Sequence, residues 1–375
     1  STKYFTISGC NYIDITASNG ALPSGYQPIY YSIDNGSTWN SLTPQTTAQS
    51  IRPAQTDGDI LLKHAGAVST VSTNVKIHLH TLTSTAKLSG NIASLCFGDN
   101  FTDTKTMPDY AYSLLFAGNS TISAHPVYIN AQNISFSSYT SVSNYGMYCL
   151  FQSCEYLTSL PDFSCITSVG DYGMCETFGG CTSLTTPPDF SNVTSVGNHG
   201  MSGVLQLCTS LTTSPDLSSV TTIGDYGMYC LLTNCSSLTT PPDVTGITTL
   251  SPYGFASMLR QCSSLTTPPD LRGIKSVSRN GFNGMFKNCS SLTTSPNLSG
   301  ITFVNSYGLQ EMFYGCTSLK TIYAPTISWD TRISSNWAYN VNPSGTLYAD
   351  ASIINSIPTN SKDGCPSGWD KEILN

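Results

Sequence analysis

Residues 285–292 read Met-Phe-Lys-Asn-Cys-Ser-Ser-Leu, and residues 312–319, 27 positions later, read Met-Phe-Tyr-Gly-Cys-Thr-Ser-Leu. The cysteine of this stretch recurs every 27 residues, and a leucine stands three residues after each one. Proline follows the first six cysteines at seven residues, and glycine at nineteen. A fixed period of this length indicates a solenoid, in which each unit buries its apolar face against the next. The repeating cysteines are Cys154, Cys181, Cys208, Cys235, Cys262, Cys289 and Cys316.

Each unit combines extended and amphipathic segments. Ser-Leu-Thr-Thr predicts a short strand that ends at the proline, because proline cannot donate to a ladder. In residues 144–154, apolar residues stand at 147, 150, 151 and 154, which is the spacing of an amphipathic helix. Asp171 and Asp225 precede such stripes, where an N-cap is preferred. The sequence therefore predicts an α/β solenoid of seven units over 145–322, each with a short strand, a loop, a second extended piece and a short helix.

The flanking segments follow other patterns. Over 1–88, short β-rich runs alternate with Gly, Pro and Asn, which predicts a small all-β sandwich, immunoglobulin-like by analogy. Residues 89–144 hold an irregular copy of the unit, in which Leu115-Phe116 matches Leu150-Phe151 at a spacing of 35. We expect this segment to be an N-terminal cap and the tryptophan-containing residues 323–375 to be a C-terminal cap, since solenoid ends need covering.

The repeats resemble the leucine-rich repeats of the BspA-like (bacterial surface protein A type) family. The shared signature is a helix that ends in aromatic-x-x-Cys, followed by Ser-Leu and then Pro, and the resemblance covers about 145–322. The sequence departs from the family in its longer, 27-residue period and in the Thr or Pro that follows the leucine. The resemblance implies a leucine-rich-repeat solenoid used for extracellular adhesion or recognition, as in gut-bacterial and phage-encoded surface proteins.

The chain is poor in charge. Of its 375 residues 10% are charged, 39% are hydrophobic, and the net charge is −7. This balance argues against nucleic acid, which is bound through Lys and Arg, and against an anionic membrane surface. No apolar run approaches the roughly 18 residues of a membrane span, so no membrane insertion is expected. A signal peptide removed before Ser1 would favour a secreted bacterial protein, whereas loss of an initiator Met alone would favour a virion protein.

Cysteine and histidine suggest metal binding, but weakly. Zinc prefers paired ligands such as C-x2-C, which the chain lacks. We therefore interpret the cysteine ladder as structural, with each cysteine a small buried apolar side chain at the end of its helix. A whole column of cysteines cannot pair into disulfides without distortion. His78 and His80 have a metal-site spacing on one face of a predicted strand, and solvent-facing side chains are the alternative. No metal and no cofactor are expected.

A column of aspartates follows the prolines. An Asx turn, in which each carboxylate accepts a bond from the backbone two residues on, explains their position. A calcium column is the alternative, and a glycosidase pair fits less well because these acids are repetitive. We therefore predict that the protein is not an enzyme. The aspartates are Asp162, Asp189, Asp216, Asp243 and Asp270.

Two sets of residues are candidates for ligand binding. Lys and Arg are absent between Lys105 and Arg260, and a basic set then follows, which predicts an anionic-ligand site, with a solvated patch or subunit contact as the alternative. A tyrosine column predicts a recognition ridge, because Tyr gives large contact area at low entropy cost; packing at the helix start is the alternative. The basic set is Arg260, Arg272, Lys275, Arg279 and Lys287; the tyrosine set is Tyr145, Tyr172, Tyr226, Tyr253 and Tyr307, with His199 and Asn280 in the same column.

These features predict a non-enzymatic extracellular recognition protein. The favoured hypothesis is a virion-associated, phage tail fibre-like protein that binds a host-cell surface glycan or protein through the solenoid. Its N-terminal domain would anchor it to a virion or cell-surface assembly, and a homo-oligomer is left open. The alternatives are a secreted bacterial cell-surface adhesin and a structural spacer of an extracellular assembly. Ser-x-Thr columns such as Ser183/Thr185 and Ser210/Thr212 leave a further hypothesis, a flat array that binds ice or crystalline glycan.

Overall fold

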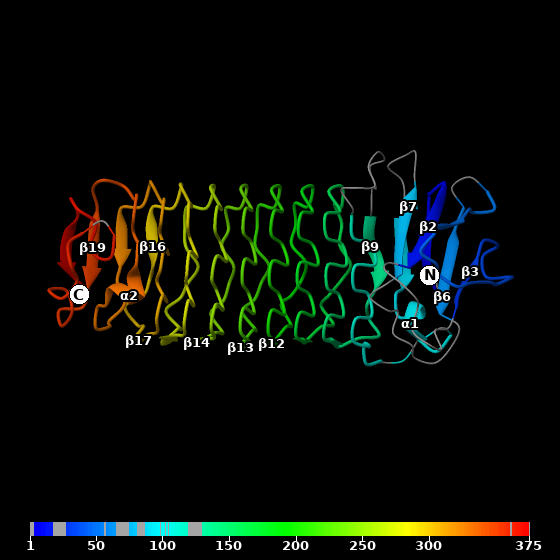
Figure 1. The fold of residues 1–375 in the computed structure, drawn as a ribbon, viewed down its shortest axis with the longest axis horizontal. Coiled ribbons are helices and arrows are strands. Elements are labelled where there is room, and N and C mark those ends of the chain that lie inside the picture. Colours follow the sequence, from blue (N-terminus) through cyan, green and yellow to red (C-terminus); the bar gives the residue numbers. More distant parts are fainter. Residues whose placement is uncertain are drawn as a thin grey trace. The chain divides into compact units, whose positions relative to one another are not determined.

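A computed structural model of the chain describes residues 4–17, 28–55, 58–64, 75–80, 87–97, 99–101, 103, 105–118, 130–360 and 362–374. The chain divides into two compact units, unit 1 (Ser1–Leu184) and unit 2 (Thr185–Asn375). Between residues 141 and 373 the chain makes about nine β-solenoid turns of about 27 residues, with very little helix (Figure 1). The predicted solenoid is confirmed, although seven was too low a count of its turns.

Unit 1 begins with two β-sheets. The six-stranded sheet has the order β4-β3-β6-β1-β8-β9 and the three-stranded sheet the order β5-β2-β7. Strands β8 and β9 pair in parallel, and the other pairs of these sheets are antiparallel. The elements are β1 (Phe5–Ser8), β2 (Tyr12–Ala17), β3 (Ile29–Ser32), β4 (Asn40–Leu42), β5 (Gln49–Ile51), β6 (Ile60–His64), β7 (Val75–His80), β8 (Lys87–Asn91), α1 (Ser94–Phe97) and β9 (Asn130–Ser135).

This region is β-sheet, as the sequence predicted. Along β2 the residues alternate between half-buried and buried, so Ile13, Ile15 and Ala17 face the core. The immunoglobulin-like topology and the domain boundaries at 88, 144 and 322 stay predictions. His78 and His80 lie on β7, but their side chains lie outside the part of the chain that the structure describes.

The core of unit 1 continues from the sheets into the turns through a file of buried phenylalanines. Phe5 of β1 stacks on Phe116 at 5.7 Å between ring centroids, and Phe116 stacks on Phe151 at 5.4 Å. Phe151 in turn stacks on Phe178 at 5.8 Å. All four rings are buried. The sheets and the first turns of unit 1 therefore share one apolar core.

The turns of both units pair through two-residue parallel strands at intervals of 27 residues. In unit 1 Ser141 pairs with Ser168, and in unit 2 Thr249 pairs with Ser276. In each strand the second residue is buried while the first is half-buried or exposed, so one side chain per strand enters the core. These strands are β10 (Ser141–Val142) and β11 (Ser168–Val169) in unit 1, and β12 (Ser195–Val196), β13 (Thr222–Ile223), β14 (Thr249–Leu250), β15 (Ser276–Val277) and β17 (Phe303–Val304) in unit 2.

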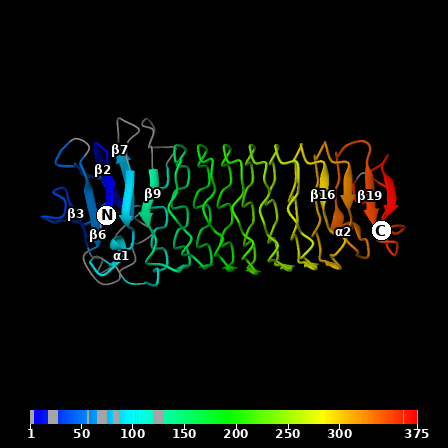
Figure 2. The same ribbon diagram turned by 180° about the vertical axis from the view of Figure 1, so that it is seen from behind.

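Unit 2 ends in a four-stranded parallel sheet with the order β16-β18-β19-β20. Its strands are β16 (Thr294–Asn297), β18 (Thr321–Tyr323), β19 (Thr346–Ala349) and β20 (Asp370–Ile373) (Figure 2). The solenoid pairing therefore continues beyond residue 322 into the segment predicted as a cap. Trp337 is buried there and donates from Nε1 to the Gly364 carbonyl at 2.8 Å. Helix α2 (Thr331–Ser334) begins after the N-cap Asp330.

The helix predicted over 144–154 is wrong, and a ribbon of tight turns stands in its place. Tyr145, Cys149 and Ser153 have φ values of 55°, 52° and 58°, which a right-handed helix excludes. Alternate N–H groups bond in two directions. Met147 N donates to Gly173 O of the following turn at 2.8 Å, whereas Leu150 N donates to Met147 O at 3.1 Å. We call this ribbon the turn segment.

The hydrophobic pattern is compatible with both structures. A ribbon with a four-residue period makes positions i and i+4 equivalent, so the i, i+3, i+4, i+7 spacing places the same residues inward as a helix does. The predicted N-caps are absent as well: Asp171 N donates to Asn144 Oδ1 and Asp225 N to Asn198 Oδ1, each at 2.9 Å. The turn segments are 109–118, 144–154 and 171–181 in unit 1, and 198–208, 225–235, 252–262, 279–289 and 306–316 in unit 2.

Candidate functional site

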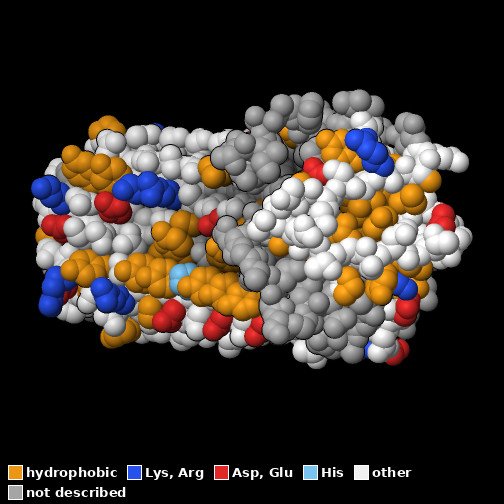
Figure 3. Space-filling model, turned by 45° about the vertical axis from the view of Figure 1, so that its right-hand side comes forward, with side chains coloured by type: hydrophobic (Ala, Val, Ile, Leu, Met, Phe, Trp, Pro, Cys, Tyr) orange, Lys and Arg blue, Asp and Glu red, His pale blue; other side chains and the backbone are white. Residues whose placement is uncertain are grey.

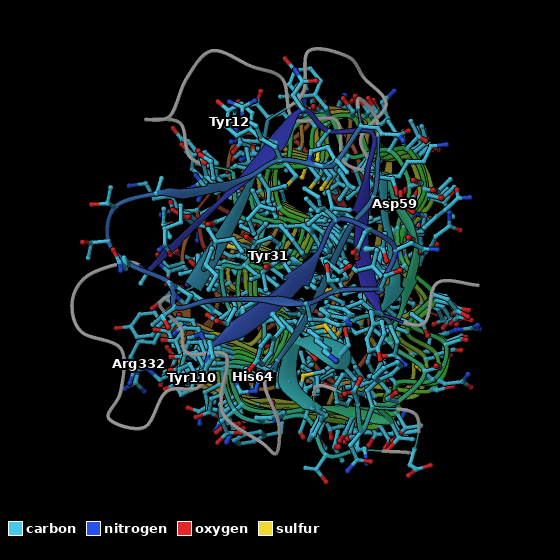
Figure 4. The ribbon with its side chains drawn as sticks, turned by 90° about the vertical axis from the view of Figure 1, so that its right-hand side faces the viewer. Tyr12, Tyr31, Asp59, His64, Tyr110 and Arg332 are labelled. Atoms are coloured by element: carbon cyan, nitrogen blue, oxygen red, sulfur yellow. The ribbon has the colours of Figure 1, made fainter. Side chains whose placement is uncertain are left out.

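The turn segments of unit 1 carry a row of stacked tyrosines at their surface. Tyr110 and Tyr145 stack with ring centroids 4.6 Å apart, and Tyr145 and Tyr172 stack at 4.7 Å with only 7° between their planes. Tyr110 is 40% exposed and lies at the outer edge of the unit in Figure 4. Sequence reasoning missed Tyr110, because it precedes Tyr145 by 35 residues rather than 27. We call these three residues the unit 1 row.

Unit 2 carries a second row. His199 stacks on Tyr226 at 4.5 Å, and Tyr226 stacks on Tyr253 at 4.3 Å, both with 7° between the planes. At the next turn the position belongs to Asn280, which is buried and accepts at Oδ1 a bond from Asn283 Nδ2 at 2.8 Å. Tyr307, one turn further, is 41% exposed and stacks on no other ring among the described residues. His199, Tyr226 and Tyr253 form the unit 2 row.

The row residues share an unusual backbone conformation. Tyr226 and Tyr253 both have φ of 56°, a left-handed conformation that costs a non-glycine residue about 1–2 kcal/mol. Two contacts offset this cost: ring stacking, worth about 0.5–1.5 kcal/mol, and the inter-turn bond from Tyr226 N to Pro252 O at 2.9 Å. The rings lie half-exposed on one another rather than inside the core (Figure 3). The alternative of packing at a helix start does not apply to these tyrosines, because the turn segments that carry them are not helical.

Tyr226 of the unit 2 row has a raised pKa. Burial and the neighbouring Tyr253 raise the pKa of Tyr226, while Arg279 opposes the shift. Tyr229, whose ring meets that of Tyr226 edge-on at 5.6 Å, has its pKa raised to about 12, first by burial and then by Cys230. The rows therefore present phenol hydroxyls that both donate and accept hydrogen bonds.

The predicted basic set does not form one cluster. Arg272 pairs with Asp270 at 2.7 Å, and Lys275 Nζ donates to the Arg272 carbonyl at 3.1 Å. Lys287 pairs with Glu311 at 2.6 Å and lies over the Tyr314 ring, 4.7 Å from its centroid. These three cations already have acceptors or anions within unit 2.

Arg260 and Arg279 differ from the other three. Neither forms an ion pair with a described carboxylate. Arg260 Nε is buried and has no hydrogen-bond partner, and its charge acts on Tyr229. Arg279 is exposed and its charge acts on Tyr226. The structure thus places Arg279 on the turn beside Tyr253, whose N–H donates to the Arg279 carbonyl at 3.0 Å, and Arg260 on the turn beside the segment that carries Tyr229.

The repeated cysteines are buried and donate to backbone carbonyls of the preceding turn. Cys181 Sγ lies 3.3 Å from Phe151 O in unit 1, and Cys262 Sγ lies 3.2 Å from Leu232 O in unit 2. Burial raises the pKa of Cys154 and of Cys289 to about 12. All fourteen cysteines lie in the described part of the chain, and none of them forms a disulfide.

The aspartate column makes the Asx turns that the sequence predicted. Ser164 N donates to Asp162 Oδ1 at 2.8 Å and Ser218 N to Asp216 Oδ1 at 2.9 Å. The pKa of Asp162 is lowered first by the Ser164 hydroxyl and then by this backbone bond, and the pKa of Asp216 first by the Ser218 backbone bond and then by the Ser218 hydroxyl. Among the described residues, no group of three or more His, Cys, Asp or Glu is placed to hold a metal ion. The helices found in the same residues are too short to cross a membrane.

Comparison with known proteins gives similarity of fold only. No family model matches the chain, and no curated protein matches it in sequence. A leucine-rich repeat protein from Bacteroides ovatus is 18% identical, with a TM-score of 0.33 over 66% of this chain and 61% of that one. A leucine-rich cell surface protein from Faecalibacterium prausnitzii is 16% identical, with a TM-score of 0.28 over 55% and 64%. A leucine-rich repeat protein from Eubacterium ventriosum is 15% identical, with a TM-score of 0.32 over 76% and 78%. The chain spans less than two thirds of the length of the first two proteins.

Proposed function

We propose that the chain is a non-enzymatic recognition protein of a bacterial cell surface. It binds a glycan or protein on another surface through the aromatic rows of its turn segments. The observation that carries the proposal is the stacking of His199, Tyr226 and Tyr253 at 4.3–4.5 Å on the surface of unit 2. This is the secreted-adhesin alternative of the sequence analysis; no described feature favours a phage tail fibre, and that hypothesis is not retained.

The rows suit recognition because they are rigid before any ligand arrives. Each ring is held by its neighbour, and each backbone position is fixed by an inter-turn bond such as Met228 N to Gly254 O at 3.1 Å. Binding therefore costs little side-chain entropy, which is the main advantage of Tyr in recognition surfaces. The turns space the rings regularly, so the rows form extended surfaces rather than isolated side chains.

The low pKa values of the aspartate column do not suit acid–base catalysis, which favours a binding function. Catalysis by acids and bases needs groups whose pKa lies near the working pH. Asp162 and Asp216 are held ionised by Asx turns, and Asp270 has its pKa lowered to about 2 by Arg272 and the backbone. In this proposal the N-terminal sheets anchor the protein, and the partner lies on a host-cell surface.

The test compares a row variant with a matched control on the full chain. Tyr226→Asn plus Tyr253→Asn removes two rings. Asparagine is chosen because Asn280 occupies the equivalent left-handed position in the repeat. Phe303→Ser removes a ring that is 56% exposed on β17, where the preceding turn carries Ser276. We expect the double variant to lose at least tenfold in binding to epithelial cells and to a printed glycan array, and the control to change less than twofold.

Equal binding by the row variant and the wild type would contradict the proposal. Failure of the wild type to bind either cells or array would favour the spacer alternative. Circular dichroism and thermal unfolding of both variants separate lost binding from lost folding.

A further inference from the structure

We propose that the unit 2 row and the two arginines beside it bind an acidic saccharide, a pyranose that carries a carboxylate or sulfate. The site consists of Tyr226, Tyr229, Tyr253, Arg260 and Arg279. This inference rests on the proposed function and names the chemical class of its ligand.

The two arginines flank the tyrosines from different turn segments. Tyr253 N donates to the Arg279 carbonyl at 3.0 Å, so Arg279 lies on the turn beside Tyr253. Asn234 N donates to the Arg260 carbonyl at 2.8 Å, so Arg260 lies beside the segment that carries Tyr226 and Tyr229. Burial is the main cause that raises the pKa of Tyr226 and of Tyr229, and the two arginines oppose it, Arg279 at Tyr226 and Arg260 at Tyr229. Asp225 is the acid that also faces Tyr226.

The two guanidinium groups are available to an anion. Arg272, Lys287 and Arg332 each have a carboxylate within 2.9 Å, whereas Arg260 and Arg279 have none among the described residues. Arg260 Nε is also buried without a hydrogen-bond partner, and an unsatisfied buried donor costs about 1–3 kcal/mol. A carboxylate or sulfate satisfies guanidinium donors in pairs, with a planar geometry that a neutral ligand lacks.

The aromatic row offers a place for the ring of the sugar. One face of Tyr253 stacks on Tyr226, while the next position of the row holds Asn280 instead of an aromatic residue. Asn280 is buried and held by Asn283, so no described ring covers the other face of Tyr253. The apolar face of a pyranose can pack on this open face of Tyr253. Its anionic group would then lie toward Arg279, which directly precedes Asn280. The stacked phenol hydroxyls match a ligand rich in hydroxyl groups better than they match a peptide.

The unit 1 row supplies an internal contrast. The residue equivalent to Arg279 there is Asp171, whose carbonyl accepts from Tyr145 N at 2.9 Å as that of Arg279 accepts from Tyr253 N. Asp109 precedes Tyr110 in the same way. Unit 2 also has a carboxylate at this position, Asp225, but it has Arg279 there two turns later, whereas unit 1 has no arginine at this position. The acidic saccharide is therefore expected to bind at unit 2, on the turn of Arg279.

The experiment measures the affinity of the full chain for four probes: polygalacturonate, its methyl ester, heparin and polyglutamate. The test variant is Arg260→Gln plus Arg279→Ser, because the repeat uses Gln206 and Ser306 at the same positions. The control variant is Arg272→Gln plus Arg332→Gln, which removes the same charge from arginines already paired with Asp270 and Asp330. We expect the test variant to lose at least tenfold in affinity for polygalacturonate or heparin, the control less than twofold, and the methyl ester to bind weakly.

Three results would overturn the inference. Equal losses in the two variants would mean a general charge effect, equal binding of the methyl ester would mean that the anion is not recognised, and tighter binding of polyglutamate would mean an acidic peptide ligand. The proposed function is judged separately, by cell binding: if Tyr226→Asn plus Tyr253→Asn abolishes it while the arginine test variant does not, the saccharide inference fails and the function stands. Unchanged thermal unfolding of the arginine variants shows that they are folded.

Discussion

The repeated cysteines donate a hydrogen bond from the thiol to a backbone carbonyl of the preceding turn. This bond explains why cysteine, a small residue with a weak donor, recurs at this position. Cys289 Sγ lies 3.0 Å from Leu259 O, and Cys316 Sγ lies 3.0 Å from Phe286 O. An alanine would leave these buried carbonyls without the bond, while a larger apolar residue would crowd the core. The sequence predicted that these cysteines are buried. It could not predict which carbonyl accepts from each thiol, because that depends on the register of adjacent turns.

The thiols make stability depend on pH in a defined direction. Burial raises the pKa of Cys154 and Cys289 from 9.0 to about 12 in the folded chain. Their contribution to the free energy of unfolding is complete below pH 9, because folded and unfolded chains are then both protonated, and it declines as pH rises toward 12, because only the unfolded chain ionises. We expect the urea midpoint, measured with a reductant, to fall steadily between pH 8.5 and 10.5.

Alanine at both positions serves as the control for this pH dependence. Cys154→Ala plus Cys289→Ala lowers the midpoint at pH 7 and makes its fall above pH 8.5 less steep, while the remaining buried thiols, Cys235, Cys262 and Cys316, keep part of the slope. A midpoint that rises with pH, or a native chain whose buried thiols react with iodoacetamide as fast as unfolded ones, would contradict the assignment of raised thiol pKa values.

At the scale of elements, the sequence predicted the repeat and its buried positions but not the turn segment. Periods of 3.6 and 4 residues cannot be distinguished over the eleven residues 144–154. Gly and Asn occupy some of the left-handed positions four and eight residues after the tyrosine column, such as Gly203 and Asn288, but Cys149, Glu176 and Leu207 occupy others. The residue types at these positions therefore do not identify the turn segment.

A glycine follows each residue of the 27-residue tyrosine column, including Asn280, and close packing explains it. A Cβ at Gly281 would lie 2.5 Å from Val277 Cγ1, whereas one at Gly273 would come no closer than 3.3 Å to any atom, that being Thr245 O. We expect Gly281→Ala to reduce the free energy of unfolding by about 1–3 kcal/mol, as overpacking does. Gly273→Ala, the control, should change it by less than about 0.5 kcal/mol, as surface changes usually do. Thermal or urea unfolding of both variants measures the difference; a Gly281→Ala protein as stable as the control would refute close packing as the reason for this glycine.

At the scale of the whole chain, low charge follows from the repeated turns. Identical residues stand beside themselves on successive turns, and like charges placed so repel, whereas Ser and Thr share hydrogen bonds such as Thr239 Oγ1 to Thr212 O at 3.1 Å. The tyrosine column could be read from the sequence because it keeps the 27-residue period. The division of the basic set could not, since it depends on which carboxylates the long side chains reach: Asp270 and Glu311 for Arg272 and Lys287, and none described for Arg260.

Hydroxyl-radical footprinting of the full chain, free and bound to epithelial cells, tests the central claim most directly. We expect the half-exposed rings of Tyr226 and Tyr253 and the exposed rings of Tyr307 and Phe303 to be oxidised in the free protein. Recognition through the turn segments predicts that Tyr226, Tyr253 and Tyr307 lose most of their oxidation on binding while Phe303 keeps its own. Protection of Phe303 with the row tyrosines still oxidised would contradict the account.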